Sequence, residues 1–151
     1  MPITQHRIVP DAKMLIRVLR DRGAADRFRR FVKRRGPALA VAAVVELELR
    51  AGARTPAQRA LSDQLLGVVA ADGRRLVPSA TAIGEAGRVM ADLATHERMS
   101  LAAQRGSFVV DVLLAVTCRE HDALLVSANV GDFARIQRHL RGFRYVSEWP
   151  T

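Results

Sequence analysis

The sequence predicts a three-layer α/β/α fold, in which helices cover both faces of a central, mostly parallel sheet of five strands. Short apolar segments alternate with longer segments of helical spacing along the chain. Turn residues mark the changes, as at Gly36-Pro37 and Asp72-Gly73. This alternation is typical of parallel strands, which need a crossover connection between them. No repeat or linker divides the chain, so we expect one domain over residues 1–151.

The elements are expected in the following order. Strands are predicted for five apolar segments, residues 6–10, 38–44, 74–78, 123–128 and 143–149. Helical spacing predicts helices within four segments, residues 14–36, 45–73, 80–99 and 108–122. A further helical turn is expected directly after the fourth strand. Pro10 lacks a backbone donor, so we expect it at the end of the first strand.

The composition indicates a folded protein outside the membrane. Apolar residues make up 49% of the chain, which argues against disorder. No apolar run reaches the roughly 18 residues that a membrane helix needs, and the N-terminal stretch lacks the apolar core of a signal peptide. Cys118 is the single cysteine, which excludes a disulfide framework and a thiol-based metal cluster. We therefore expect a soluble, cytoplasmic protein.

The net charge of +9 is carried almost entirely by arginine, since Lys13 and Lys33 are the only lysines. Guanidinium groups bind phosphate in a bidentate way, so the charge fits a polyanionic partner, either a nucleic acid or an acidic protein segment. An arginine- and alanine-rich genome composition explains the same bias, and the charge alone does not decide between these explanations.

A run of basic residues lies within residues 27–35. With Phe28, Phe31 and Val32 on its apolar side, it reads as a helix with one solvated face. The same face is the best candidate for a contact with an RNA backbone. Its candidate residues are Arg29, Arg30, Lys33 and Arg34.

One carboxylate, Asp111, lies in the middle of the apolar stretch 107–118. In a helix its neighbours three, four and seven residues on are Leu114, Ala115 and Cys118, all non-polar. An isolated ionised carboxylate on such a face costs several kcal/mol unless it is compensated. A helix cap or an arginine partner would compensate it, and so would a metal ion bound together with further acids.

Further acids follow the predicted strands. Asp11 follows the first strand, Glu46 and Glu48 follow the second, and Asn129 and Asp132 follow the fourth. The carboxyl ends of parallel strands share one edge of the sheet, which is where sites form in such folds. These side chains are therefore expected at a common edge.

Glu46 and Glu48 lie about 200° apart around a helix, so they cannot face the same pocket. Glu48 is the better candidate, because Gly52, four residues on, leaves room on its face. We therefore expect Asp11, Glu48, Asp111 and Asp132 to meet.

Four carboxylates close together stay ionised only around a cation. Oxygen ligands without His or Cys suit Mg²⁺ or Mn²⁺. Such a site in a basic protein is suited to phosphodiester hydrolysis. Ser127 can position an acid or a water there.

The stretches "IVPDAKMLIRVLRD", "VVELELRAGA" and "FVVDVLLAVTCREHDALLVSANVGDF" resemble, in order and spacing, the motifs of PIN-domain ribonucleases, most closely the VapC toxins of bacterial toxin–antitoxin pairs. The resemblance runs from about residue 8 to the C-terminus. It implies a Mg²⁺- or Mn²⁺-dependent endoribonuclease that acts on an RNA substrate. It also implies a homodimer that is inhibited by a small VapB-like antitoxin.

The resemblance assigns the site residue by residue. It implies that Asp11, Glu48, Asp111 and Asp132 are catalytic, with Asp11, Asp111 and Asp132 as metal ligands. Asn129 is implied as an accessory residue, and Ser127 and Lys13 are further accessory candidates.

One departure from the family's motifs concerns Lys13, because the family usually has small polar residues after its first Asp. Pointing inward, the ammonium group would take the place of a metal ion; pointing outward, it would hold a substrate phosphate. The first orientation leaves a second hypothesis open, a catalytically weakened PIN-like domain that binds RNA or a partner protein. A third, a phospho-aspartate enzyme or receiver domain, is disfavoured because Lys13 stands where a second acid is needed.

Overall fold

The computed structural model describes residues 6–100 and 106–151, and its strands and helices alternate as the sequence predicts. The strands are β1 (Ile8–Pro10), β2 (Val41–Ala42), β3 (Arg75–Leu76), β4 (Leu124–Val126) and β5 (Arg144–Val146). The helices are α1 (Ala12–Arg20), α2 (Arg22–Arg35), α3 (Ala43–Gly52), α4 (Pro56–Val69), α5 (Ala80–His96), α6 (Gly106–Glu120) and α7 (Val130–His139), and a 3₁₀ turn η1 (Gly36–Ala38) follows α2. Each observed strand lies within a predicted one.

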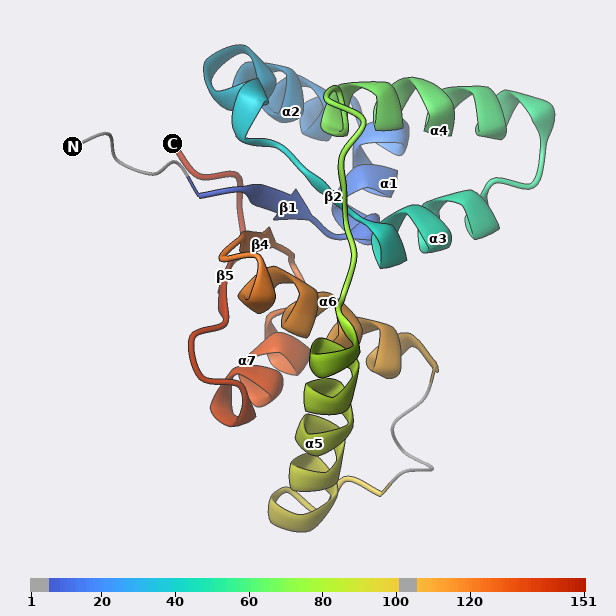
Figure 1. The fold of residues 1–151 in the computed structure, drawn as a ribbon. Helices are drawn as coiled ribbons and strands as arrows, with labels where there is room; N and C mark the ends of the chain where they lie inside the picture. The colour runs from blue at the N-terminus through green and yellow to red at the C-terminus, as the bar shows by residue number, and fades with distance from the viewer. Residues whose placement is uncertain (1–5, 101–105) are drawn as a thin grey trace.

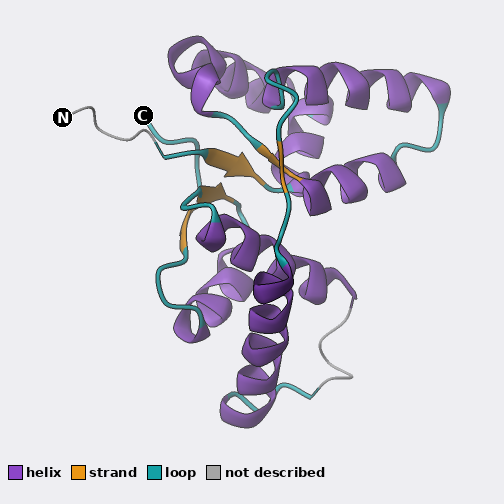
Figure 2. Cartoon of the chain, in the orientation of Figure 1, coloured by secondary structure: helices purple, strands orange, loops and turns teal. Residues whose placement is uncertain are grey.

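All strand pairings in the described residues are parallel (Figure 2). One group has the order β1-β4-β5, and β2 pairs with β3. A parallel bridge between Ile8 and Leu39 joins the two groups, and the N–H of Ala40 donates to the carbonyl of Ile8 at 3.0 Å. The strands therefore follow one another as β3-β2-β1-β4-β5, with β1 in the centre.

Helices cover both sides of these strands (Figure 1). The helices α1 to α4 lie on one side, and α5, α6 and α7 lie on the other. The side chains of both helical layers and of the strands meet in one apolar core, whose fully buried members include Phe31, Val41, Leu93, Leu125 and Phe133. The predicted three-layer α/β/α class is thereby confirmed.

Two predicted helical segments are each broken into two helices by a capping residue. Within 14–36, Asp21 adopts an extended backbone and its carboxylate accepts the N–H of Ala24 at 2.9 Å, which starts α2. Within 45–73, Thr55 and Gln58 form a reciprocal capping box that starts α4. The helical spacing predicted helices within each segment but not where one helix ends and the next begins, because apolar spacing continues across a cap.

The predicted strand 38–44 is also shorter than expected, since α3 begins at Ala43. By contrast, Pro10 is the last residue of β1, as predicted, and lies opposite Val126. The next residue, Asp11, donates its N–H to the carbonyl of Val126 at 3.0 Å. The central strand thus ends directly at the first candidate acid.

Within residues 6–100 and 106–151, no helix is long and apolar enough to cross a membrane.

Candidate active site

Asp11 links the ends of two adjacent strands. The residue is 6% exposed, and its Oδ1 caps α1 by accepting the N–H of Met14 at 2.8 Å. The hydroxyl of Ser127, directly after β4, donates to the other carboxylate oxygen and accepts the N–H of Asn129 at 3.0 Å. Burial raises the pKa of Asp11, although the hydrogen bonds from Ser127 and Met14 act in the opposite direction. The carboxylate is therefore fixed in position by its own helix and by β4.

Asn129 bridges two further acids. Its Nδ2 donates to Asp111 Oδ2 at 3.1 Å and to Asp132 Oδ2 at 3.2 Å, so both carboxylates flank a single amide nitrogen. Asp111 comes from the middle of α6 and Asp132 from the first turn of α7. Two helices that are separate in sequence thus present their acids to the same amide.

Asp111 is half-buried, and its pKa is raised to about 7. Burial is the largest cause, and the negative charges of Asp132, Glu48 and Asp11 follow. These effects agree with the expectation that the four acids share one edge of the sheet. The helix-cap interpretation of Asp111 is wrong, because α6 begins five residues earlier, at Gly106.

Glu48 lies on α3 and is half-buried. Burial is the largest cause of its raised pKa, and the charge of Asp11 adds to it. Lys13 is exposed, and its positive charge lowers the pKa values of Asp11, Glu48 and Asp111. Among the described residues Lys13 forms no ion pair within 4.0 Å. It therefore lies near the acids without neutralising any one of them by direct contact.

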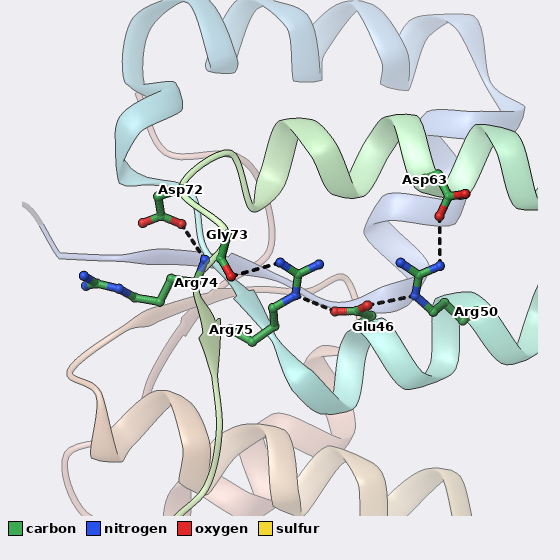
Figure 3. A network of polar contacts seen from close by, with 7 residues as sticks. All are labelled: Glu46, Arg50, Asp63, Asp72, Gly73, Arg74 and Arg75. Atoms are coloured by element: carbon green, nitrogen blue, oxygen red, sulfur yellow. Dashed lines mark hydrogen bonds and ion pairs between the residues drawn. The ribbon is translucent and has the colours of Figure 1, made fainter.

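Glu46 faces elsewhere, into a network of ion pairs on the opposite side of α3 (Figure 3). Its two oxygens accept from Arg75 Nε at 2.7 Å and Arg50 Nε at 2.8 Å, and Arg50 also donates to Asp63 at 2.9 Å. The hydrogen bonds from Arg75 and Arg50 lower the pKa of Glu46. Glu46 therefore stabilises the contacts of α3 with β3 and α4, and it lies outside the candidate site.

Pairing with basic groups separates the candidate acids from most other acids. The chain has 15 Asp and Glu residues, all within the described ranges. Ten of them have an Arg or His nitrogen of the described residues within 4.0 Å. The five without such a partner are Asp11, Glu48, Asp111, Asp132 and Glu148. In a protein of charge +9, four unpaired acids at one edge of the sheet are a distinct feature.

The donor chemistry of this edge fits a hard divalent cation, because the acids supply only oxygen and repel one another. The carboxylates are, however, too far apart to coordinate one metal ion as they stand. Within the described residues, no three His, Cys, Asp or Glu side chains already lie close enough together to hold a metal ion. Asp11, Asp111 and Asp132 therefore match a Mg²⁺ or Mn²⁺ site in ligand type, and an ion would have to draw them closer.

The four basic residues predicted to contact RNA are all exposed on α2. They differ in their surroundings. Arg30 and Arg34 line a cleft of about 520 Å³, whereas Arg29 pairs with Asp26 at 2.6 Å and Lys33 lies outside the cleft.

Two further arginines, Arg17 and Arg27, line the same cleft and were missed at the sequence level. Their spacing offered a signal. Arg17 lies three residues after Met14, and Arg27 lies three residues before Arg30, so each shares a helix face with a residue of the cleft.

Comparisons with known proteins agree with this geometry. A family model described as "PIN domain" matches residues 8–139. No curated protein sequence matches the chain.

Solved structures are similar over nearly the whole chain. One is the FitAcB structure from Neisseria gonorrhoeae, with 15% identity, 95% of this chain and 99% of that chain covered, and a TM-score of 0.70. Another is DNA-bound VapBC from Salmonella typhimurium, with 17% identity, coverages of 93% and 97%, and a TM-score of 0.68. A third is VapBC2 from Rickettsia felis bound to a DNA fragment from its promoter, with 15% identity, coverages of 92% and 96%, and a TM-score of 0.67. At these identities the likeness concerns the fold. Because the family model spans most of the sequence and the observed fold agrees with it, the chain belongs to the PIN domain family.

Proposed function

We propose that the protein is a divalent-metal-dependent endoribonuclease and the toxin of a VapBC-type toxin–antitoxin pair. The observation that carries this proposal is the group of four unpaired acids, Asp11, Glu48, Asp111 and Asp132, at the carboxyl edge of the sheet. Ten of the other eleven acids have a basic partner among the described residues, as Glu46 does. Acids that lack such partners are free to hold a cation and, through it, a phosphate.

The side chains of the proposed site have different roles. Asp11, Asp111 and Asp132 would hold Mg²⁺ or Mn²⁺, which when bound supplies a water of lowered pKa and neutralises charge on the phosphate. Ser127 holds Asp11 in place, and Asn129 keeps Asp111 and Asp132 side by side. These hydrogen bonds fix the carboxylates before substrate arrives, which lowers the cost of ordering them during the reaction.

Glu48 has no hydrogen-bonding partner among the contacts of the described residues, and it lies close enough to raise the pKa of Asp111. A carboxylate in this position can accept a proton from a water next to the other three acids. Of the four exposed basic residues of α2 expected to contact the RNA backbone, Arg30 and Arg34 line the cleft beside these acids.

We further propose a small VapB-like antitoxin and a second copy of this chain as partners, in the cytoplasm. Structures named VapBC and FitAcB are among the most similar folds, and their names describe two-component complexes. An apolar groove between α1, α3 and α4 supports a helical partner, since Ile16, Leu19, Leu49 and Leu61 line it. Leu61 is 45% exposed in the isolated chain.

The test is cleavage of total cellular RNA by purified protein with Mg²⁺, with Mn²⁺ and with EDTA. We expect cutting only with the metals. Cutting that persists in EDTA would contradict the proposal, as would the absence of any cutting by the wild type and by the Lys13→Asn variant.

A second candidate function rests on Lys13. Its charge acts on three of the four acids and opposes their repulsion, as a weakly bound cation would. In that case the chain is a weakened PIN domain that binds RNA or a partner protein. Lys13→Asn decides between the two: cutting that appears only in the variant supports the binding function, and cutting by the wild type supports the nuclease.

A further inference from the structure

A cleft of about 520 Å³ lies between α1, α2 and the C-terminal residues after β5. Its charged lining consists of Arg17, Arg27, Arg30 and Arg34 against a single acid, Glu148. We call it the arginine cleft. The lining therefore has a strong excess of positive charge, which an anionic ligand would compensate.

The arginine cleft adjoins the candidate active site. Met14 lines the cleft, and its N–H caps Asp11. Ala128 also lines it and lies between Ser127 and Asn129 in the chain. Arg17 lies three residues after Met14 on α1 and lines the same cleft. A ligand that fills the cleft would therefore reach the edge of the acidic site.

The arginines of the cleft are largely free of acidic partners. Within the described residues, no Asp or Glu oxygen lies within 4.0 Å of Arg17, Arg30 or Arg34, and Arg27 reaches Asp21 only at 4.0 Å. This contrasts with Arg50 and Arg75, which are held by Glu46 at less than 3 Å. Unpaired guanidinium groups repel one another, and phosphate oxygens satisfy their N–H donors in a bidentate geometry.

The arginines form a row. Arg27, Arg30 and Arg34 occupy one face of α2 and span about 10 Å along its axis. Arg17 adds a fourth guanidinium from α1, the helix that Asp11 caps. A row of positive charges that ends beside a group of acids matches a ligand with regularly repeated phosphates.

Trp149 forms a fixed wall of the cleft. Its ring stacks on Phe31 with centroids 4.9 Å apart and packs against Phe28 at 5.3 Å. It is also the only tryptophan in the chain, so its fluorescence reports directly on this cleft.

We propose that the arginine cleft binds successive backbone phosphates of one RNA strand and directs that strand to the acidic edge. The identity of the ligand rests on the proposed nuclease function, but the binding itself requires neither metal nor cleavage. Among the four basic residues of α2 predicted to contact RNA, the proposal selects Arg30 and Arg34 and excludes Arg29 and Lys33.

The test is a titration of Trp149 fluorescence with a ten-nucleotide oligouridine RNA in EDTA, which separates binding from metal-dependent cleavage. Two double variants remove the same charge from exposed positions of one helix, Arg30→Gln/Arg34→Gln inside the cleft and Arg29→Gln/Lys33→Gln outside it. We expect the first variant to bind at least tenfold more weakly and the second to change less than twofold. The slope of log affinity against log salt should fall by about 1.4 in the first variant, as expected for two lost contacts to a single strand.

Equal losses in both variants, or none in either, would overturn the proposal, because binding would then not be localised in the cleft. Binding of polyglutamate in place of the RNA would overturn it in favour of an acidic protein ligand. If the first variant fails to fold by circular dichroism, Arg17→Gln on α1 is compared with the single control Arg29→Gln, and its slope should fall by about 0.7. RNA binding by a wild type that cuts no RNA would support the cleft while contradicting the nuclease, so the two failures are distinguishable.

Discussion

Glu46 and Glu48 stand two residues apart on the same helix and experience opposite environments. Two arginines hold Glu46 and lower its pKa, whereas burial and a neighbouring acid raise the pKa of Glu48. The difference shows how one helix can serve two purposes. One face of α3 contributes Glu46 to ion pairs, and the other face carries Glu48, which has no basic partner among the described residues.

The largest expected effect tests whether unpaired acids are functional. Asp111→Asn should reduce metal-dependent RNA cleavage by at least about 1000-fold, or roughly 4 kcal/mol in the barrier, because a charged ligand is lost. The fold should persist, since the amide oxygen of Asn can still accept from Asn129. Cleavage is measured on total RNA with Mg²⁺. Asp63→Asn, which removes an acid of the ion-pair network, is the control and should cut like the wild type.

A second comparison exchanges the two glutamates directly. Glu48→Gln should lower cleavage about 100-fold, equivalent to about 2.7 kcal/mol, without lowering the melting temperature. Glu46→Gln should leave cleavage unchanged and lower stability by about 1 kcal/mol, because two partly exposed ion pairs lose their charge. Kinetics and thermal melts of both variants check this. The reverse pattern would show that we have assigned the two faces of α3 wrongly.

The pH dependence of stability sharpens the contrast further. Since the pKa of Asp111 is raised to about 7, the metal-free folded state binds its proton more tightly than the unfolded chain does. Ionisation of Asp111 therefore leaves the free energy of unfolding almost unchanged near pH 4 and lowers it increasingly as the pH rises toward 8. We expect metal-free Asp111→Asn to be more stable than the wild type by about 2 kcal/mol at pH 8, after allowance for partial exposure.

At pH 4 the advantage of this variant should nearly vanish, because Asp111 is then protonated in the folded wild type. Urea unfolding at both pH values is the measurement. An advantage of equal size at both values would mean that repulsion among the acids is not its cause.

The smallest expected effect is stabilisation by metal. At a concentration ten times the Kd, Mg²⁺ should stabilise the wild type by about 1.4 kcal/mol and should leave Asp111→Asn unaffected. Thermal melts with Mg²⁺, Mn²⁺ and EDTA measure it. Glu46→Gln should retain the shift in full, and its loss there would point to a general effect of ionic strength.

The order of the elements and the positions of the strands could be predicted from the sequence, because apolar period and turn chemistry are local properties. The helices within 14–36 and 45–73 were predicted, but the breaks at Asp21 and Thr55 were not, because a side chain that caps a helix does not interrupt the apolar pattern. The positions of Asp11 and Asp132 followed from the rule that parallel strands end at one edge.

The arginine cleft could not be predicted in the same way. It depends on the packing of α1 against α2 and on the C-terminal residues around Trp149, which meet only in three dimensions. The same holds for the partners of Glu46, since Arg75 lies 29 residues further along the chain. Geometry between distant segments, unlike the period within one segment, leaves no regular trace in a single sequence.

The double attachment of Asp11 has a genetic consequence. Its carboxylate caps α1 and accepts from the buried Ser127 hydroxyl, so a replacement would cost about 1 kcal/mol for the cap and would leave that hydroxyl without an acceptor. Asp111 caps no helix, and the hydrogen bond that it accepts from Asn129 can be kept by an Asn in its place. Under the proposed toxin function, in a selection for loss of toxicity, substitutions at Asp11 should therefore lower the amount of protein in the cell, whereas Asp111→Asn should leave an abundant, inactive protein that still competes for its partners.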